Sequence, residues 1–441
     1  MKNKVLTLLL LPTLLIGCNS SPKSVKKYDL KFSTFLFTDS NGNTFDIDYK
    51  IPLNKLSFKH ESTSFSKDLA IISFASNINS SSKENMADFY QSFGFDDISY
   101  SSDFDLPETK ESIKFTLAHR EMDNEDIIAL TACGSSYTKQ WESNLNIGES
   151  SNAYGFEVSV NRVLTELTTY LDKYEQANNL KLWITGYSRS AAICDLLSVY
   201  LIDNQIISES NLYAYLFETP QGFDASIDAN YRSIFNIINS GDIVTHLAPS
   251  KYGLKRAGVD IDIYRSNADS LFKKFDSRLT PSAFTPLTQY KNEQELISTL
   301  FGSILNVKSE DYADIDISTR ANYCLNIQTN ITYLISLAFS LKGETTSEIV
   351  QQIQNMEMSE IAMLLANDNA YEFLKPILDS HQETYDDELL KASLAKLIRV
   401  VTNSSFFGYI ALVEHVRNSL FRTVQFHCPE AILPLLVQYK A

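Results

Sequence analysis

The sequence predicts an α/β protein with a mainly parallel central sheet and a large helical insertion before its C-terminal segment. Three observations lead to this fold class. Short apolar strands alternate with amphipathic helices through the first part of the chain, which is the pattern of a parallel sheet covered on both faces. One strand runs directly into Gly186-Tyr187-Ser188-Arg189-Ser190 and a helix. Beyond about residue 266, apolar residues recur at helical rather than strand spacing.

The core elements follow from local periodicity. Residues 29–60 alternate apolar and polar positions, as in Phe45-Asp46-Ile47-Asp48-Tyr49 and Leu56-Ser57-Phe58-Lys59, and predict strands. A helix begins near residue 68. We then expect strands over 113–117, 127–131, 180–185, 212–217 and 234–238, with helices over 156–171 and 188–201. The segment Asp39-Ser40-Asn41-Gly42-Asn43 predicts a hairpin turn rather than a calcium loop, because Lys50 stands where such a loop has its bidentate glutamate.

The expected domain organisation places an α/β core with N-terminal strands over 29–265 and a helical insertion or cap over 266–420. Residues 421–441 form the C-terminal part of the core. Within the insertion, the apolar residues Leu389, Leu390, Leu394 and Leu397 lie on one helical face. The β-like run Thr423-Val424-Gln425-Phe426 precedes a final helix that follows Pro429.

The first residues predict export and a lipid anchor. Lys2 and Lys4 precede an apolar stretch over 5–16 that is too short to span a bilayer. Leu15-Ile16-Gly17-Cys18 resembles the lipobox of bacterial lipoproteins, in which the signal is cut before the cysteine and its thiol is acylated. The resemblance implies a signal peptide over 1–17, a lipid on Cys18, a polar tether over 18–28, and a location outside the cytoplasm on the cell membrane or outer membrane. An ordinary secretory signal is the alternative.

Composition excludes several classes of function. A net charge of −16 argues against nucleic acid and anionic surfaces as partners. The cysteines after Cys18 have no CxxC spacing, so we expect no metal site and no disulfide framework, although one or two bridges remain open. These residues are Cys133, Cys194, Cys324 and Cys428. The chain has no phosphate-binding glycine loop, and we expect no cofactor.

The strand, sharp turn and helix around Ser188 predict the nucleophile elbow of an α/β-hydrolase. Such a turn lifts the serine hydroxyl above the sheet and brings the N–H groups of the helix N-terminus towards a developing oxyanion. Ser188 is therefore the candidate nucleophile. The usual motif has glycine two positions after the serine, and this chain has Ser190.

A second segment resembles the class 3 lipase family, the fungal-type triacylglycerol lipases and their bacterial relatives. In that family a strand ends in Phe-Arg-Gly-Thr/Ser, followed by tryptophan and then asparagine or aspartate. The run from Ala132 through Gly134-Ser135 to Trp141 and Asn144 is similar to it without a gap. The resemblance implies that Ser135 contributes to the oxyanion hole by its hydroxyl and backbone N–H, and that the N–H of Arg189 is the second donor. Cys133 stands in place of the family's arginine.

The acid and the base are expected later in the chain. Asn239-Ser240-Gly241-Asp242 through Pro249 resembles the family's Asn-x-x-Asp-x-Val-x-x-x-Pro segment, which implies that Asp242 orients the catalytic histidine. A solvated turn aspartate is the alternative. Asp242 also follows a strand, where parallel sheets place functional side chains.

His427 is the preferred base among six histidines. The triad order of this fold is Ser, Asp, His, which removes His60 and His119. His246 is too close to Asp242 to fold back across the site. His381 and His415 fall on helices where a structural histidine is the default, whereas His427 lies on a loop and resembles the His-x-Pro-Glu segment of bacterial relatives.

These residues predict a carboxylic ester hydrolase, a lipase or esterase acting on lipids or other acyl esters through an acyl-enzyme. The membrane is the second expected partner, through the lipid anchor. A thioesterase or peptidase with the same triad is one alternative. A surface-binding lipoprotein that has lost activity is another, because Ser190 and Cys133 depart from the family pattern. Because the helical block lies between acid and base in sequence, it is a candidate lid.

Overall fold

The computed structural model describes residues 25–39, 41–134, 140–149, 151–176, 179–228, 230–242, 244–246, 252–279, 319–326, 330–357, 360, 363–364, 369–403 and 424–440. The expected signal peptide, Cys18, Ser135 and His415 lie outside these residues. Among the described helices, none is both long enough and apolar enough to cross a membrane.

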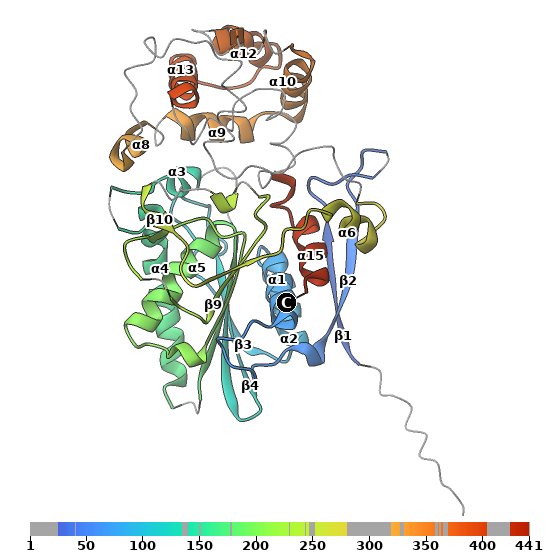
Figure 1. Ribbon diagram of the computed structural model, residues 1–441, viewed down its shortest axis with the longest axis vertical. Helices are drawn as coiled ribbons and strands as arrows, with labels where there is room; N and C mark the ends of the chain where they lie inside the picture. The colour runs from blue at the N-terminus through green and yellow to red at the C-terminus, as the bar shows by residue number, and fades with distance from the viewer. Residues whose placement is uncertain are drawn as a thin grey trace, which may run out of the picture.

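A seven-stranded sheet forms the centre of the molecule (Figure 1). Its order is β11-β9-β7-β6-β5-β4-β3. The strands are β3 (Asp96–Tyr100), β4 (Phe115–Met122), β5 (Glu125–Ala132), β6 (Lys181–Tyr187), β7 (Leu212–Phe217), β9 (Ile234–Ile238) and β11 (Val259–Asp262). Strands β5, β6, β7, β9 and β11 are parallel, and β3 and β4 are antiparallel at one edge. The mainly parallel sheet expected from the sequence is confirmed.

The register of the parallel strands brings their carboxyl ends to one level. Ala132 pairs with Gly186, Gly186 pairs with Leu216, and Leu216 pairs with Asn236. Residues that follow β5, β6, β7 and β9 therefore emerge at the same edge of the sheet. This is the edge where parallel α/β sheets place their functional loops.

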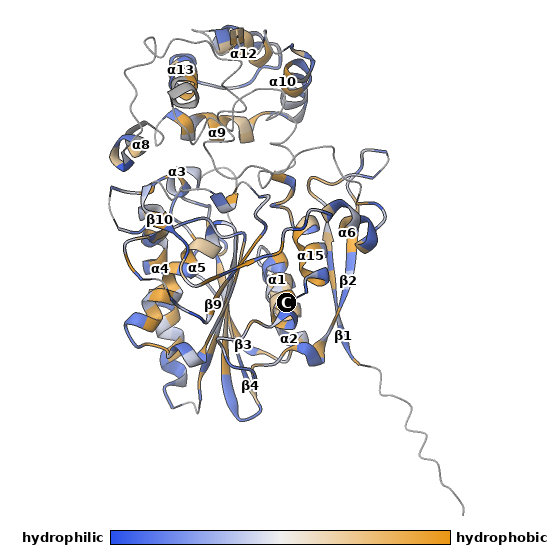
Figure 2. Ribbon diagram, in the orientation of Figure 1, coloured by the Kyte–Doolittle hydropathy of each residue, from blue (hydrophilic) through white to orange (hydrophobic). Residues whose placement is uncertain are grey.

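Helices cover both faces because alternate strand residues face opposite sides. On one face, Leu182, Ile184 and Leu216 pack against α4 (Tyr154–Leu171) and α5 (Arg189–Asp203). On the other face, Trp183 and Tyr215 pack among α1 (Lys67–Asn79), α2 (Lys83–Ser92) and α15 (Pro429–Gln438). Figure 2 shows hydrophobic residues along the central strands and α15.

The N-terminal strands form a separate antiparallel hairpin of β1 (Lys27–Ser33) and β2 (Asp46–Pro52). The strand expected at Leu56-Ser57-Phe58-Lys59 is wrong, since these residues have no regular structure after a 3-10 turn at Leu53–Lys55. The backbone of this segment is hydrogen-bonded by side chains rather than by a neighbouring strand. The carbonyl of Phe58 accepts hydrogen bonds from Lys181 and from the hydroxyl of Tyr213.

The chain after residue 265 begins with a helix of the core. Helix α6 (Ala268–Phe275) packs on α15 and on the N-terminal segment, where Phe272 meets Phe37 edge to face at 5.5 Å. Phe272 is fully buried there. The short elements that complete the core are α3 (Trp141–Asn144), β8 (Phe223–Asp224) and β10 (Leu254–Lys255).

The described part of the helical block has its own small apolar cluster, separate from the two sides of the sheet. Its helices are α8 (Arg320–Asn326), α9 (Thr332–Ser340), α10 (Gly343–Asn355), α12 (Asn369–Ser380) and α13 (Asp387–Asn403). Figure 1 shows these helices as a layer beyond α3. Phe339 of α9 stacks on Trp141 of α3 at 5.9 Å. Arg320 donates hydrogen bonds to the carbonyls of Gly148 and Ser151, both at 2.9 Å.

Candidate active site

Ser188 occupies a sharp turn between β6 and α5. Its backbone has φ 60° and ψ −130°, a sparsely populated conformation for a residue with a side chain. A Cβ atom at Gly186 would lie 2.6 Å from the carbonyl oxygen of Ser190, so only glycine allows the helix to approach the strand this closely. This geometry is that of a nucleophile elbow.

Ser190 braces the elbow at the position where the usual motif has glycine. Its hydroxyl oxygen accepts a hydrogen bond from the Tyr187 N–H at 2.9 Å. The same oxygen lies 3.0 Å from the carbonyl oxygens of Ala132 and Tyr187, to either of which its proton can be donated. The departure from the usual motif is therefore accommodated, because a buried, hydrogen-bonded side chain fills the space.

The structure brings Ser188, His427 and Asp242 into one hydrogen-bonded chain. Nε2 of His427 lies 2.9 Å from Oγ of Ser188, and Nδ1 of His427 lies 2.6 Å from Oδ2 of Asp242. Asp242 is fully buried, and Ser188 is 9% exposed. Burial lowers the pKa of His427 to about 4, so its imidazole is neutral at neutral pH and able to accept a proton.

Two residues, Tyr187 and Glu430, hold the loop that carries His427 in place. The ring of Tyr187 stacks on the imidazole with centroids 5.0 Å apart, and the Tyr187 hydroxyl donates a hydrogen bond to the His427 carbonyl. Glu430, in the first turn of α15, accepts hydrogen bonds from the N–H groups of Phe35 and Leu36 at 2.7 and 2.8 Å. The loop that carries His427 is thus fixed to both the elbow and the N-terminal segment.

Asp242 lies in a tight turn after β9. Its N–H donates to the carbonyl of Asn239 at 2.8 Å, and its Oδ1 accepts from the N–H of Val244 at 2.9 Å. Gly241 allows the histidine loop to approach, because a Cβ there would lie 2.7 Å from the ring of Phe426. Burial raises the pKa of Asp242.

The structure adds Glu218, which the sequence reasoning missed. Glu218 directly follows β7, is fully buried, and is linked to Asp242 through Asn239, whose N–H donates to Glu218 Oε2 at 3.0 Å and whose carbonyl accepts the Asp242 N–H at 2.8 Å. Burial raises the pKa of Glu218, and the neighbouring Asp242 raises it further. The available signal was one also used for Asp242, namely an acid at the carboxyl end of an apolar strand.

The guanidinium of Arg189 points away from the reacting groups and into the protein. Its Nη2 donates to the hydroxyls of Ser143 and Ser159 at 3.2 and 2.8 Å. Burial lowers its pKa to about 10. As the first residue of α5, Arg189 has a backbone N–H without a partner in the helix. That N–H is the group expected to serve the oxyanion hole.

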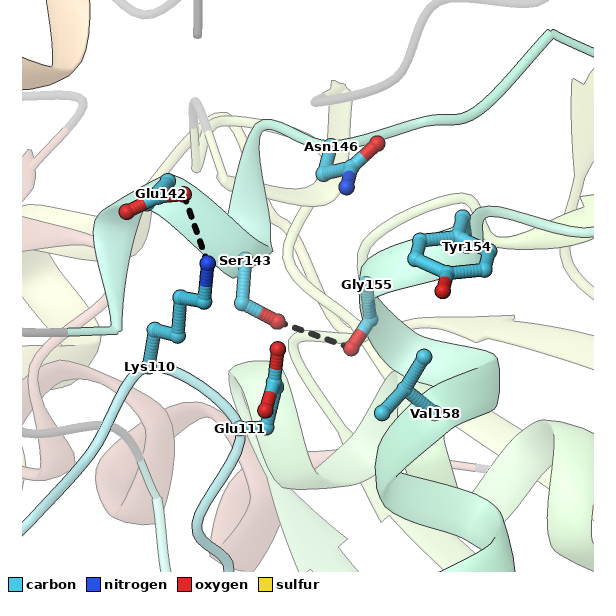
Figure 3. A pocket seen from close by; sticks show the side chains of 8 residues that line it. All are labelled: Lys110, Glu111, Glu142, Ser143, Asn146, Tyr154, Gly155 and Val158. Carbon is cyan, nitrogen blue, oxygen red and sulfur yellow. Dashed lines mark hydrogen bonds and ion pairs between the residues drawn. The ribbon is translucent and has the colours of Figure 1, made fainter. Parts of the chain in front are cut away.

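Ser143, one of the two serines that bind the Arg189 guanidinium, lines a small polar cavity (Figure 3). Ser143 of α3 donates to the carbonyl of Gly155 at 2.8 Å, and Lys110 forms an ion pair with Glu142 at 3.0 Å. The cavity of about 20 Å³ is lined by none of the three residues of the hydrogen-bonded chain. It therefore belongs to the support of the elbow rather than to the reacting groups.

Ser135 lies outside the described residues, but the chain leading to it reaches the elbow. A Cβ atom at Gly134 would lie 3.4 Å from Tyr187, and the N–H of Cys133 bonds the carbonyl of Lys114. Cys133, Cys194, Cys324 and Cys428 are free thiols. Among the described residues, no group of three His, Cys, Asp or Glu side chains is arranged to hold a metal ion.

The histidine loop differs from its expected structure. The strand predicted at Thr423-Val424-Gln425-Phe426 is wrong over its described part, since Val424 and Gln425 are helical and Phe426 lies in a turn. Thr423 lies outside the described residues. The N–H of His427 bonds the carbonyl of Val424, and the N–H of Cys428 bonds that of Gln425. This turn leads directly into α15, where Cys428 is the N-cap.

Two histidines set aside in the sequence lie apart from this chain of hydrogen bonds. His246 contacts the carbonyl of Ser240 at 3.1 Å, and His381 pairs with Glu348 at 2.7 Å within the helical block.

Together, the sheet, its covering helices and the elbow define an α/β-hydrolase fold. The sequence model of the family described as Lipase (class 3) matches residues 108–252, which include the elbow and Asp242 but not His427. A search of curated proteins gives no match.

Solved structures of lipases are similar to part of this chain. One is a fungal lipase–inhibitor complex, with 23% identity over 45% of this chain and 80% of that chain, at a TM-score of 0.39. A second is a triacylglycerol lipase described as having a serine protease triad, with 21% identity over 46% and 83%, at 0.38. The native Rhizomucor miehei lipase propeptide complex has 24% identity over 46% and 71%, also at 0.38.

Proposed function

We propose that this protein is a serine hydrolase of the class 3 lipase family that cleaves carboxylic esters, with Ser188, His427 and Asp242 as its catalytic triad. The observation that carries the proposal is the hydrogen-bonded chain from Ser188 Oγ through His427 to Asp242, with distances of 2.9 and 2.6 Å. The family match to residues 108–252 supports the same class of reaction.

The proposed mechanism follows from these distances. Nε2 of His427 takes the proton of Ser188 as the serine oxygen attacks the ester carbonyl, and Asp242 stabilises the imidazolium that forms. The backbone N–H of Arg189 and the N–H and hydroxyl of Ser135 stabilise the oxyanion. His427 then gives its proton to the leaving alcohol, which leaves an acyl group on Ser188. Water, activated by His427, releases the acid.

A fluorophosphonate probe tests this proposal, because it reacts with an activated serine and needs no knowledge of the natural ester. We expect labelling of the wild-type protein, loss of labelling in Ser188→Ala, and strong reduction in His427→Ala. Hydrolysis of short and long p-nitrophenyl esters then separates esterase from lipase preference. Absence of label on the wild type, or equal label on Ser188→Ala, contradicts the proposal and favours a binding protein on a hydrolase scaffold.

We further propose that the protein acts at a membrane to which Cys18 is tethered by an acyl chain. The support is the apolar stretch over 5–16 and the Leu15-Ile16-Gly17-Cys18 motif. Detergent phase partitioning tests this: the full chain should enter the detergent phase and Cys18→Ser should not. Equal partitioning of both proteins contradicts the anchor.

The helical block is proposed to act as a lid over the site. Its support is the contact of α9 with α3 and the anchoring of Arg320 on the carbonyls of residues 147–152. Arg320→Ala should loosen this anchor and speed proteolytic cleavage within the block. Cleavage that leaves the hydrolysis of long-chain esters unchanged contradicts a lid.

A further inference from the structure

Glu218 lies beside the proposed catalytic acid in a strained position. It is the first residue after β7, and its φ of 49° falls in the left-handed region that side chains disfavour. Its N–H bonds the carbonyl of Ile237 at 2.9 Å, which fixes this conformation at the end of the sheet. The side chain is fully buried. A strained, buried acid needs partners that keep it there.

The surroundings of the Glu218 carboxyl group indicate that either Glu218 or Asp242 carries a proton. Oε2 accepts the N–H of Asn239 at 3.0 Å, and Oε1 has no donor among the described residues. The neighbouring acid is Asp242, whose N–H donates to the carbonyl of the same Asn239 at 2.8 Å, so the backbone of Asn239 contacts both residues. Two carboxylates only accept hydrogen bonds, so these two groups can bond each other only when one of them carries a proton.

Asp242 is the acid of the pair that is better supplied with donors. It accepts the N–H of Val244 on Oδ1 at 2.9 Å and the Nδ1–H of His427 on Oδ2 at 2.6 Å. Glu218 has one backbone donor, from Asn239. Hydrogen bonds to the charged form favour that form, so the negative charge belongs on Asp242 and the proton on Glu218.

We propose that Glu218 is a positioning residue that stays protonated and donates its O–H to Asp242, so that the buried pair carries a single negative charge. This inference rests on the proposed triad. The neutral donor fixes the Asp242 carboxylate opposite His427, and Asn239 fixes Glu218 in turn. The pair titrates as a unit, because two adjacent buried carboxyls resist ionising together.

Among the described residues that face the pair, none offers a direct countercharge to a second negative charge. His427 and Cys428 face it from the loop before α15. Arg256 donates to the carbonyls of Thr219 and Thr245 at 3.2 and 2.7 Å, but its ion pair is with Asp260. Asp262, at the end of β11, bonds the Ser240 hydroxyl. Ionisation of Glu218 at alkaline pH therefore places a second charge beside Asp242 and disrupts its alignment.

The variants that test this are Glu218→Gln and Glu218→Ala, with Asp195→Asn as the matched control. Glutamine keeps a neutral N–H donor for Asp242 and an oxygen for the Asn239 N–H, whereas alanine keeps neither. Asp195 is also a fully buried acid, but it lies on α5 and bonds the Ala257 N–H, away from the triad. The control should match the wild type in kcat, KM and pH profile.

We expect Glu218→Ala to lower kcat by about 10- to 100-fold with little change in KM, because the acid loses its alignment. Glu218→Gln should restore most of that rate and also remove the alkaline decline of kcat. A structural role alone does not move the pH profile. Equal kcat in Glu218→Ala and the wild type overturns the proposal, as does an alkaline decline that persists in Glu218→Gln.

Infrared difference spectroscopy gives a readout that does not depend on ester turnover. The wild-type minus Glu218→Gln spectrum at neutral pH should contain the C=O band of a protonated carboxyl group. A carboxylate band in its place overturns the proposal even if the enzyme is active. Failure of the wild type to hydrolyse esters or to take the probe refutes the proposed function instead, and the infrared band still reports the proton on Glu218.

Discussion

Gly241 and Phe426 are in direct contact, since a Cβ atom on Gly241 would lie 2.7 Å from Cδ2 of the Phe426 ring. Gly241 precedes the proposed acid and Phe426 precedes the proposed base. The ring is 1% exposed and meets Tyr264 edge to face at 5.8 Å, so it has little room to move. The separation of the two loops is therefore set at this contact.

Gly241→Ala should force the two loops apart. We expect a fall in kcat on the order of 10- to 100-fold, because small displacements of reacting groups are costly. The free energy of unfolding should fall by about 1–3 kcal/mol from overpacking. Ester kinetics and thermal unfolding measure both effects. Gly343→Ala is the control, since a Cβ there meets nothing within 4 Å; a similar loss in both variants contradicts the explanation.

Ser190→Ala should weaken the elbow. It removes the hydroxyl that accepts the partly buried Tyr187 N–H, and losing such a hydrogen bond costs about 0.5–1.5 kcal/mol. Urea unfolding measures this loss, and the rate of probe labelling should fall with it. Ser198→Ala on the same helix is the matched control, because Ser198 is equally buried but only donates to the carbonyl of Cys194. Indistinguishable stabilities of the two variants would count against bracing by Ser190.

Arg189→Lys should destabilise the protein although it keeps the charge. A lysine cannot reproduce the planar guanidinium that reaches both Ser143 and Ser159. We expect a loss of about 1–3 kcal/mol in the free energy of unfolding. Arg162→Lys, at an ion pair with Asp103 whose arginine side chain is 44% exposed, should change it by less than about 0.5 kcal/mol. Equal effects in chemical denaturation contradict a special role for the buried arginine.

Asp195 should make stability depend on pH. Burial raises its pKa to about 7 in the folded protein, against an ordinary value of about 4 in the unfolded chain. Between these values the folded state binds more protons than the unfolded state, so stability falls as pH rises from about 4 to about 7. Asp195→Asn keeps an acceptor for the Ala257 N–H but has no carboxyl group to titrate. It should therefore remove a decline of about 1 kcal/mol per pH unit in the free energy of unfolding.

The measurement for Asp195 is the free energy of unfolding of wild type and variant at several pH values. Asp88→Asn, at an exposed aspartate of α2, is the control and should keep the wild-type slope. Parallel curves for wild type and Asp195→Asn would show that Asp195 does not titrate in this range.

The sequence predicted the elements whose pattern is local. Apolar runs gave the strands that lead to Ser188 and to Asp242. Chain order removed two of six histidines, and local context together with the resemblance to a His-x-Pro-Glu segment selected His427 among the rest. The structure then brings these three side chains within hydrogen-bonding distance. The run from Thr423 to Phe426 was misread, because four alternating residues fit a strand as well as a helical turn.

Tertiary contacts explain what the sequence did not reveal. Glu218 follows an apolar strand, but the significance of this acid depends on burial beside Asp242, which no local pattern reports. The stacking of Tyr187 on His427 joins residues 240 positions apart. In the sequence, Ser190 is only a departure from the usual nucleophile-elbow motif. Its hydrogen bonds with Tyr187 and Ala132, which depend on the fold, explain why serine fits there.

His427 reaches Ser188 across a sequence separation of 239 residues, and it does so only when α15 is docked between α1 and α6. Contacts of such long range form after local ones, because the entropy of closing the loop must first be overcome. A chain that has folded its sheet but not yet docked α15 therefore has Ser188 without the histidine proposed as its base. Reactivity towards esters should appear as one of the last events of folding, which keeps the nascent protein inert.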